Sequence, residues 1–74
     1  MRRGLRLALA FTFLASSAFA QAAQDEAAAA AQFERGLNEM KAGRYDTGCP
    51  ALAESYRLDS RPRTLFTLAE CKAK

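Results

Sequence analysis

The stretch FERGLNEMKAGRYDTGCPALAESYRLD, residues 33–59, decides the fold of this chain. Its first part has the spacing i, i+3, i+4 and i+7 that marks one face of an α-helix, in Phe33, Gly36, Leu37 and Met40. Gly43 follows at the place where a left-handed residue usually ends a helix. We therefore predict a first helix over about residues 26–42.

The second part of the stretch predicts another helix. Its apolar face has the spacing i, i+4, i+7, i+8 and i+11, in Tyr45, Cys49, Leu52, Ala53 and Tyr56. If Asp46 caps this helix, Pro50 lies near the end of the first turn and removes one backbone hydrogen bond. Alternatively, Cys49 is the cap and Pro50 takes the first helical position, which proline favours. In both cases the helix ends by Leu58 or Asp59.

A third helix is predicted after the turn at residues 59–61, with Pro62 in its first turn. One face carries Leu65, Leu68, Ala69 and Lys72, and Phe66 and Cys71 flank it. Because the turns have about two to four residues, neighbouring helices should be antiparallel. The sequence reaches Lys74 without a helix stop signal, so we expect the protein to continue beyond it.

The two cysteines of the chain, Cys49 and Cys71, are predicted to lie opposite each other. If the turn is centred at Ser60, each cysteine is 11 residues from the centre, which is about 16 Å along a helix. The same register places Leu52 opposite Leu68. We expect a disulfide if the compartment is oxidising, and two buried free thiols remain the alternative.

The amino terminus predicts export. It has a positive start (Arg2, Arg3 and Arg6), a short apolar run over residues 7–15, and the small-x-small sequence Ala18-Phe19-Ala20 that a signal peptidase needs. The apolar run is too short for a membrane-spanning helix, which needs about 20 apolar residues. We therefore predict a signal peptide over residues 1–20, a mature chain that starts at Gln21, no stable membrane anchor after cleavage, and a periplasmic or secreted location.

Removal of residues 1–20 changes both the charge and the size of the chain. The net charge of +3 comes from 11 basic and 8 acidic residues, and three of the basic residues lie in the predicted signal peptide. The mature part is therefore neutral, which argues against a nucleic-acid partner. Residues 21–31 are alanine-rich and form either a spacer or a helix start. Residues 32–74 form a helical region that needs a disulfide or a neighbour for stability.

The composition argues against catalysis. The chain has no His, so His general bases and His metal ligands are excluded. The two cysteines do not form a C-x-x-C pair, and no pair of carboxylates is distinguished from ordinary helix-surface charge. We expect no enzymatic activity, no metal and no cofactor.

Residues 33–74 resemble a tetratricopeptide repeat (TPR), a helix-turn-helix unit of about 34 residues, of the type found in exported bacterial proteins. The resemblance is carried by Ala42-Gly43-Arg44-Tyr45 in the turn, Cys49-Pro50 on the second helix and Leu58-Asp59 before the next unit. It implies small residues where paired helices meet, at Gly36, Gly48 and Ser55, and a large apolar residue at Leu52. Leu65, Leu68 and Ala69 match the opening of a following unit. Gln32 and Glu39 depart from the pattern.

The resemblance implies an all-α, antiparallel helix-turn-helix repeat with one TPR-like unit and the first helix of a second. It also implies an exported scaffold that binds a protein or peptide, completed by further repeats or by a second copy of the chain. The expected core is Phe33, Leu37, Met40, Leu52, Tyr56, Leu65 and Leu68, and the expected ligand-facing residues are Arg35, Asn38 and Glu39. The alternative is a small secreted, disulfide-stapled helical hairpin that acts as a peptide or as an envelope chaperone.

Overall fold

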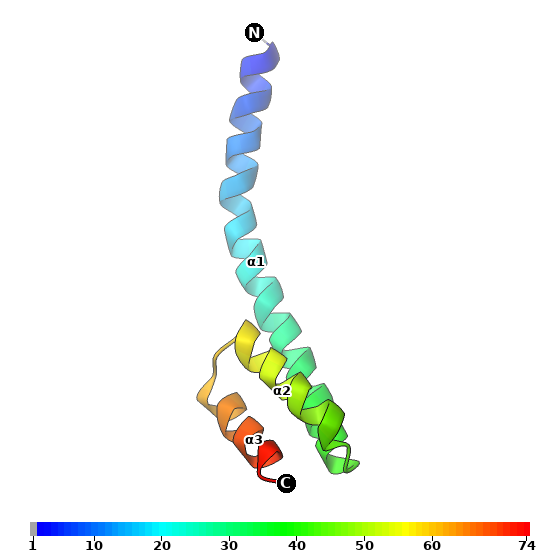
Figure 1. Cartoon of the computed structure of the whole chain (residues 1–74). Helices are drawn as coiled ribbons and strands as arrows, with labels where there is room; N and C mark the ends of the chain where they lie inside the picture. The colour runs from blue at the N-terminus through cyan, green and yellow to red at the C-terminus, as the bar shows by residue number, and fades with distance from the viewer. Residues whose placement is uncertain (1) are drawn as a thin grey trace.

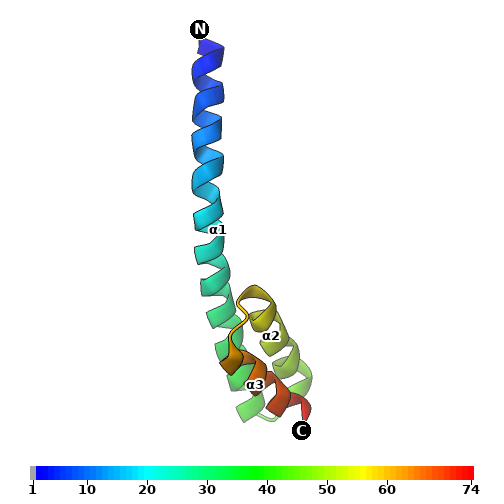
Figure 2. The same cartoon turned by 90° about the vertical axis from the view of Figure 1, so that its left-hand side faces the viewer.

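The described part of the chain folds into three α-helices joined by short turns. The computed structural model describes residues 2–74, and it describes side chains from Phe19 onward. α1 spans Arg2–Lys41, α2 spans Tyr45–Leu58 and α3 spans Pro62–Lys72. Figures 1 and 2 show α1 as a long rod, with α2 and α3 packed beside its C-terminal part. No strand occurs in residues 2–74, so the predicted all-α, helix-turn-helix class is confirmed.

α1 begins far earlier than the first helix predicted from the sequence. The helix runs from Arg2 without interruption, whereas the periodicity placed its start near residue 26. Residues 21–31 are part of this helix and not a flexible spacer. They are rich in alanine, which has the highest helix propensity of all residue types. The 40 residues of α1 account for the long axis of 64 Å.

Gly43 ends α1 in the way that the sequence predicted. Its φ angle is +77°, in the left-handed region that glycine enters without a steric penalty. The N–H of Gly43 donates to the carbonyl of Met40 at 2.9 Å, and the N–H of Arg44 donates to the carbonyl of Glu39 at 2.8 Å. This pair of bonds is a Schellman motif, which satisfies carbonyls at the end of α1 and turns the chain into α2.

α1 and α2 approach each other closely through Gly36 and Gly48, as the resemblance implied. A Cβ on Gly36 would lie 2.6 Å from Cγ of Leu52, and a Cβ on Gly48 would lie 3.2 Å from the carbonyl oxygen of Gly36. Ser55, which is 2% exposed, donates from its hydroxyl to the carbonyl of Ala29 at 2.7 Å. Three small residues therefore allow the two backbones to meet along α2.

α2 begins at Tyr45, so both predictions for its start were wrong. The N-cap is Arg44, which makes no side-chain capping bond, and Asp46 lies inside the first turn. Pro50 lies within the helix and not at its first position. Because proline has no N–H, the backbone hydrogen bond to the carbonyl of Asp46 is not made. Pro50 lies close enough to the start of α2 for the helix to continue past it.

The core lies where α2 is enclosed between α1 and α3. It contains Phe33, Leu52, Leu68 and Cys71, with Leu37, Met40, Tyr45 and Cys49 packed against it. Leu52 is 0% exposed and forms the centre of this cluster. The predicted core residue Tyr56 is half-buried, and Ala53 is exposed while Ala51 is buried. The buried stripe of α2 is thus Gly48, Ala51, Leu52 and Ser55.

The disulfide between Cys49 and Cys71 joins α2 to α3, as the register predicted. The two Cα atoms are 5.6 Å apart. Cys71 is 1% exposed and Leu68 is buried beside it. α3 starts after Arg61 with Pro62 as its first residue, which confirms the predicted turn.

The predicted face of α3 was wrong. Its buried residues are Thr64, Leu68 and Cys71, whereas Leu65 is 47% exposed and Ala69 is exposed. Leu65 is six residues before Cys71, which is about 120° around the helix, so a helix that buries Leu68 together with Cys71 turns Leu65 toward solvent. The disulfide and the Leu68 contact with α2 fix this rotation of the helix.

Candidate functional site

A groove of about 340 Å³ lies between α1 and the α2–α3 turn. All three helices and the turn contribute to it, so it exists only in the folded hairpin. Its lining residues are Glu26, Ala29, Ala30, Phe33, Glu34, Ser55, Asp59, Arg61, Arg63 and Thr64. Its volume is at the lower end of the range for ligand sites in proteins, about 300–1,000 Å³.

The floor of the groove is apolar and comes from α1. Ala29, Ala30 and Phe33 lie on one side of the helix, at the spacing i, i+1 and i+4. The small alanine side chains leave room over α1, and the Phe33 ring closes one end of that space. Ser55 and Thr64 are buried polar residues at the other wall, and no buried side-chain polar atom in the described part lacks a hydrogen-bond partner. The floor can therefore accept an apolar group without exposing an unpaired polar atom.

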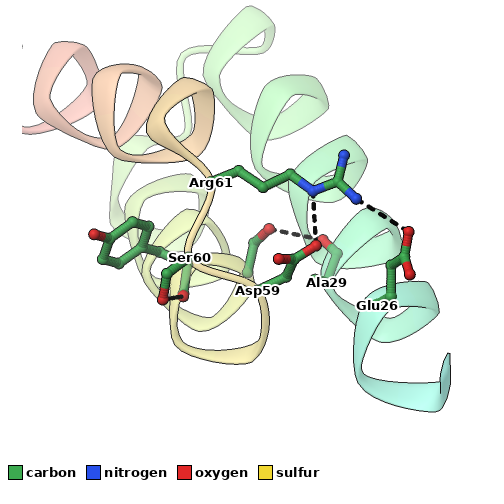
Figure 3. A network of polar contacts seen from close by, with 7 residues as sticks. Glu26, Ala29, Asp59, Ser60 and Arg61 are labelled. Atoms are coloured by element: carbon green, nitrogen blue, oxygen red, sulfur yellow. Dashed lines mark hydrogen bonds and ion pairs between the residues drawn. The ribbon is translucent and has the colours of Figure 1, made fainter. Parts of the chain in front are cut away.

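The rim of the groove is held by Arg61, which bridges the turn and α1 (Figure 3). Its Nε donates to Oδ2 of Asp59 at 2.7 Å, and its Nη2 donates to Oε1 of Glu26 at 3.0 Å. Asp59 in the first place, and Glu26 in addition, raise the pKa of the Arg61 guanidinium. The side chains of Arg61 and Glu26 are exposed and that of Asp59 is partly exposed, so these ion pairs position the turn more than they stabilise the fold.

Arg63 covers the end of the groove that Phe33 forms. Its Cζ atom lies 4.7 Å from the centroid of the Phe33 ring, a cation–π contact between α3 and α1. The guanidinium N–H groups lie in the plane of the group, so stacking on the ring leaves them free to donate to an acceptor. Glu34 supplies a carboxylate to the same lining. The groove thus offers donors and acceptors around an apolar floor.

The three predicted ligand-facing residues are not brought together in this groove. Arg35 lines a second, shallower hollow of about 280 Å³ on another side of α1 and α2, and Asn38 is an exposed residue of α1 that lines neither. Glu39 accepts hydrogen bonds from Arg44 and, at 2.8 Å, from Thr47. The hydrogen bond from Arg44 lowers the pKa of Glu39 most, and the hydrogen bond from Thr47 lowers it further. Glu39 therefore joins α1 to the start of α2.

The sequence analysis missed most of the groove. Glu26, Ala29, Ala30 and Phe33 form a stripe on α1 with helical spacing, which is the one local signal for it. The uniform alanine run hides the stripe, because every position there has the same small side chain. Nothing in the sequence indicates that Arg61 and Arg63 line a groove, since charged residues are common next to turns.

The predicted cleavage site lies on α1, away from the groove. Ala20 and Gln21 are exposed, and Gln21 donates to Oδ1 of Asp25 at 3.1 Å. Ala18 is helical, but its side chain lies outside the described part.

The described part of the chain has neither a cluster of metal-binding side chains nor a membrane-spanning helix. There, no group of three or more His, Cys, Asp or Glu side chains is arranged to hold a metal ion. Among the described helices, none has a stretch long and apolar enough to cross a membrane. The resemblance to TPR proteins stays a prediction, since comparison of the chain with protein-family models, curated proteins and solved structures gave no match.

Proposed function

We propose that this chain is an exported, TPR-like helical module that binds a peptide or a protein segment and carries out no catalysis. The observation that carries this proposal is the groove between α1 and the α2–α3 turn. It combines an apolar floor and a charged rim with walls from three helices, and apolar grooves of this kind take up the side chains of peptide segments.

The chemistry of the groove favours a peptide over a small polar metabolite. Its charged residues are of both signs: Glu26, Glu34 and Asp59 against Arg61 and Arg63. An extended peptide presents N–H donors and carbonyl acceptors along its length, and side chains that reach an apolar floor. The floor at Ala29 and Ala30 accommodates one apolar side chain of such a peptide, and the rim binds its backbone.

The affinity of selected peptides for variants of the groove tests this proposal. We would select binders from a random dodecapeptide library on the oxidised chain and measure their affinity for Ala30→Glu. Ala30 is an exposed groove residue, so the new side chain fills the floor without disturbing the core. We expect at least a tenfold loss of affinity, about 1.4 kcal/mol. Ala53→Glu, at an exposed position on α2 outside both hollows, is the matched control and should bind normally. Equal binding by both variants would refute the groove as the site.

The proposed export rests on residues 1–21 and is compatible with the disulfide, since oxidising compartments preserve disulfides. Amino-terminal sequencing of the protein from the periplasm or the medium should find Gln21 as the first residue. An intact Met1 on membrane-bound protein would refute the signal peptide.

A further inference from the structure

α3 is apolar on two opposite faces. One face packs in the core through Thr64, Leu68 and Cys71. The other, which we name the outer face of α3, consists of Pro62, Leu65, Phe66 and Ala69, with Ala73 just after the end of the helix. Phe66 is 70% exposed and Leu65 is 47% exposed, so two of the three large exposed apolar side chains in the described part lie side by side here. A helix that is apolar on both sides is usually covered on both sides.

We propose that the outer face of α3 binds the outer face of a second copy of this chain, with the two α3 helices antiparallel about a two-fold axis. The choice of occupant rests on the charges along the edge of this face. Arg63 and Glu70 are seven residues apart, which is close to two helical turns, so they lie on the same edge. Neither of them forms an ion pair within the described chain.

Two-fold symmetry brings these charges into register. Around a two-fold axis, the same edges of two antiparallel helices meet with reversed direction. If the axis passes between Phe66 and Thr67, Arg63 of each copy lies level with Glu70 of the other, and two ion pairs form. Stacking of Arg63 on Phe33 does not prevent this, since the guanidinium donates within its plane.

The same register fits the apolar residues by size. The two copies of Phe66 meet at the axis, where a pair of aromatic rings packs well. Leu65 of one copy comes within one residue, about 1.5 Å of helix rise, of the small Ala69 of the other. The basic Lys72 lies on the opposite edge, and its two copies are about 16 Å apart along the helix axis, beyond strong repulsion in salt.

The size of the contact sets the expected affinity. α3 has 11 residues, so each copy contributes less surface than the roughly 800 Å² that stable complexes usually bury. We therefore expect a dimer with a dissociation constant of about 10–500 µM. Sedimentation equilibrium of the oxidised chain, as recovered from expressing cells, covers this range between about 10 µM and 1 mM.

Variants of the outer face and of its edge test the two parts of the proposal. Phe66→Glu should leave the chain monomeric, and the matched control Ala53→Glu should dimerise normally. Arg63→Glu and Glu70→Arg should each weaken the dimer roughly tenfold, because each reverses two ion pairs. The double variant should recover to within about threefold of the original affinity, since it restores both pairs.

Three results would overturn the proposal. A chain that is monomeric up to 1 mM would leave the outer face to another partner, such as a further helix of a longer chain. A dimer that survives Phe66→Glu would use another surface. A double variant as weak as the single variants would exclude the antiparallel register. Phe66 and Glu70 do not line the groove, whereas Arg63 does. The variants of Arg63 are read out by oligomeric state and not by peptide affinity, so each of these results is separable from failure of the peptide-binding proposal.

Discussion

The disulfide should decide whether α3 stays folded on α2. Apart from Cys71, α3 buries only Thr64 and Leu68, and it is shorter than the length at which isolated helices become stable. The bond joins residues that are 22 apart in the sequence. Closing a loop of this length removes chain entropy from the unfolded state that is equivalent to about 3 kcal/mol. That amount is comparable to the whole stability that a single small core supplies.

We therefore expect Cys49→Ala combined with Cys71→Ala to lower the free energy of unfolding by about 3 kcal/mol. At roughly 4–8 °C per kcal/mol, the midpoint of thermal unfolding should fall by about 12–24 °C. Circular dichroism at the helix band, recorded for the oxidised chain with and without reductant, measures this fall. Reductant should have no effect on the double variant, which serves as the control for nonspecific effects.

Two outcomes would refute this reasoning. A midpoint that falls by less than about 5 °C would mean that packing of Leu68 alone holds α3 in place. A reduced chain that unfolds in a steep transition above about 60 °C would mean that the core needs no crosslink. Amide hydrogen exchange separates these cases, because loss of the crosslink alone should release α3 before α2.

Three further predictions concern the contact between α1 and α2. Gly36→Ala should destabilise the fold by about 1–3 kcal/mol in urea titrations despite its higher helix propensity, because the new Cβ would overlap the buried side chain of Leu52; unchanged stability would contradict the close approach. Ser55→Ala should cost about 1 kcal/mol in the same assay, since it removes the buried bond to the carbonyl of Ala29, and a gain in stability would contradict that bond. The carboxyl pKa of Glu39 in the folded chain, measured by NMR titration, should lie below the ordinary value of 4.5. A lowered pKa in the folded state stabilises the fold at pH values above the unfolded pKa, and this contribution should disappear as the pH falls through the folded pKa. An ordinary pKa would contradict the hydrogen bonds that Glu39 accepts.

The sequence by itself determined the helices of the hairpin and their turns. Gly43 and Pro62 act locally: a glycine enters the left-handed region without strain, and a proline fits the first helical position wherever it occurs. The register of Cys49 and Cys71 also followed from the sequence, because two antiparallel helices with a short turn allow few alignments. The start of α1 did not follow, since an alanine run has no periodicity that marks a boundary.

Only the tertiary structure decided which face of α3 is buried and where the groove lies. α3 has apolar residues around most of its circumference. Periodicity alone therefore predicts two equally good buried stripes, one with Leu65 and Ala69 and one with Leu68 and Cys71. Packing against α2 chooses between them, because the crosslink and the Leu68 contact fix the helix rotation. The groove depends on that same rotation, which places Arg63 over Phe33, a contact between residues 30 apart that no local pattern specifies.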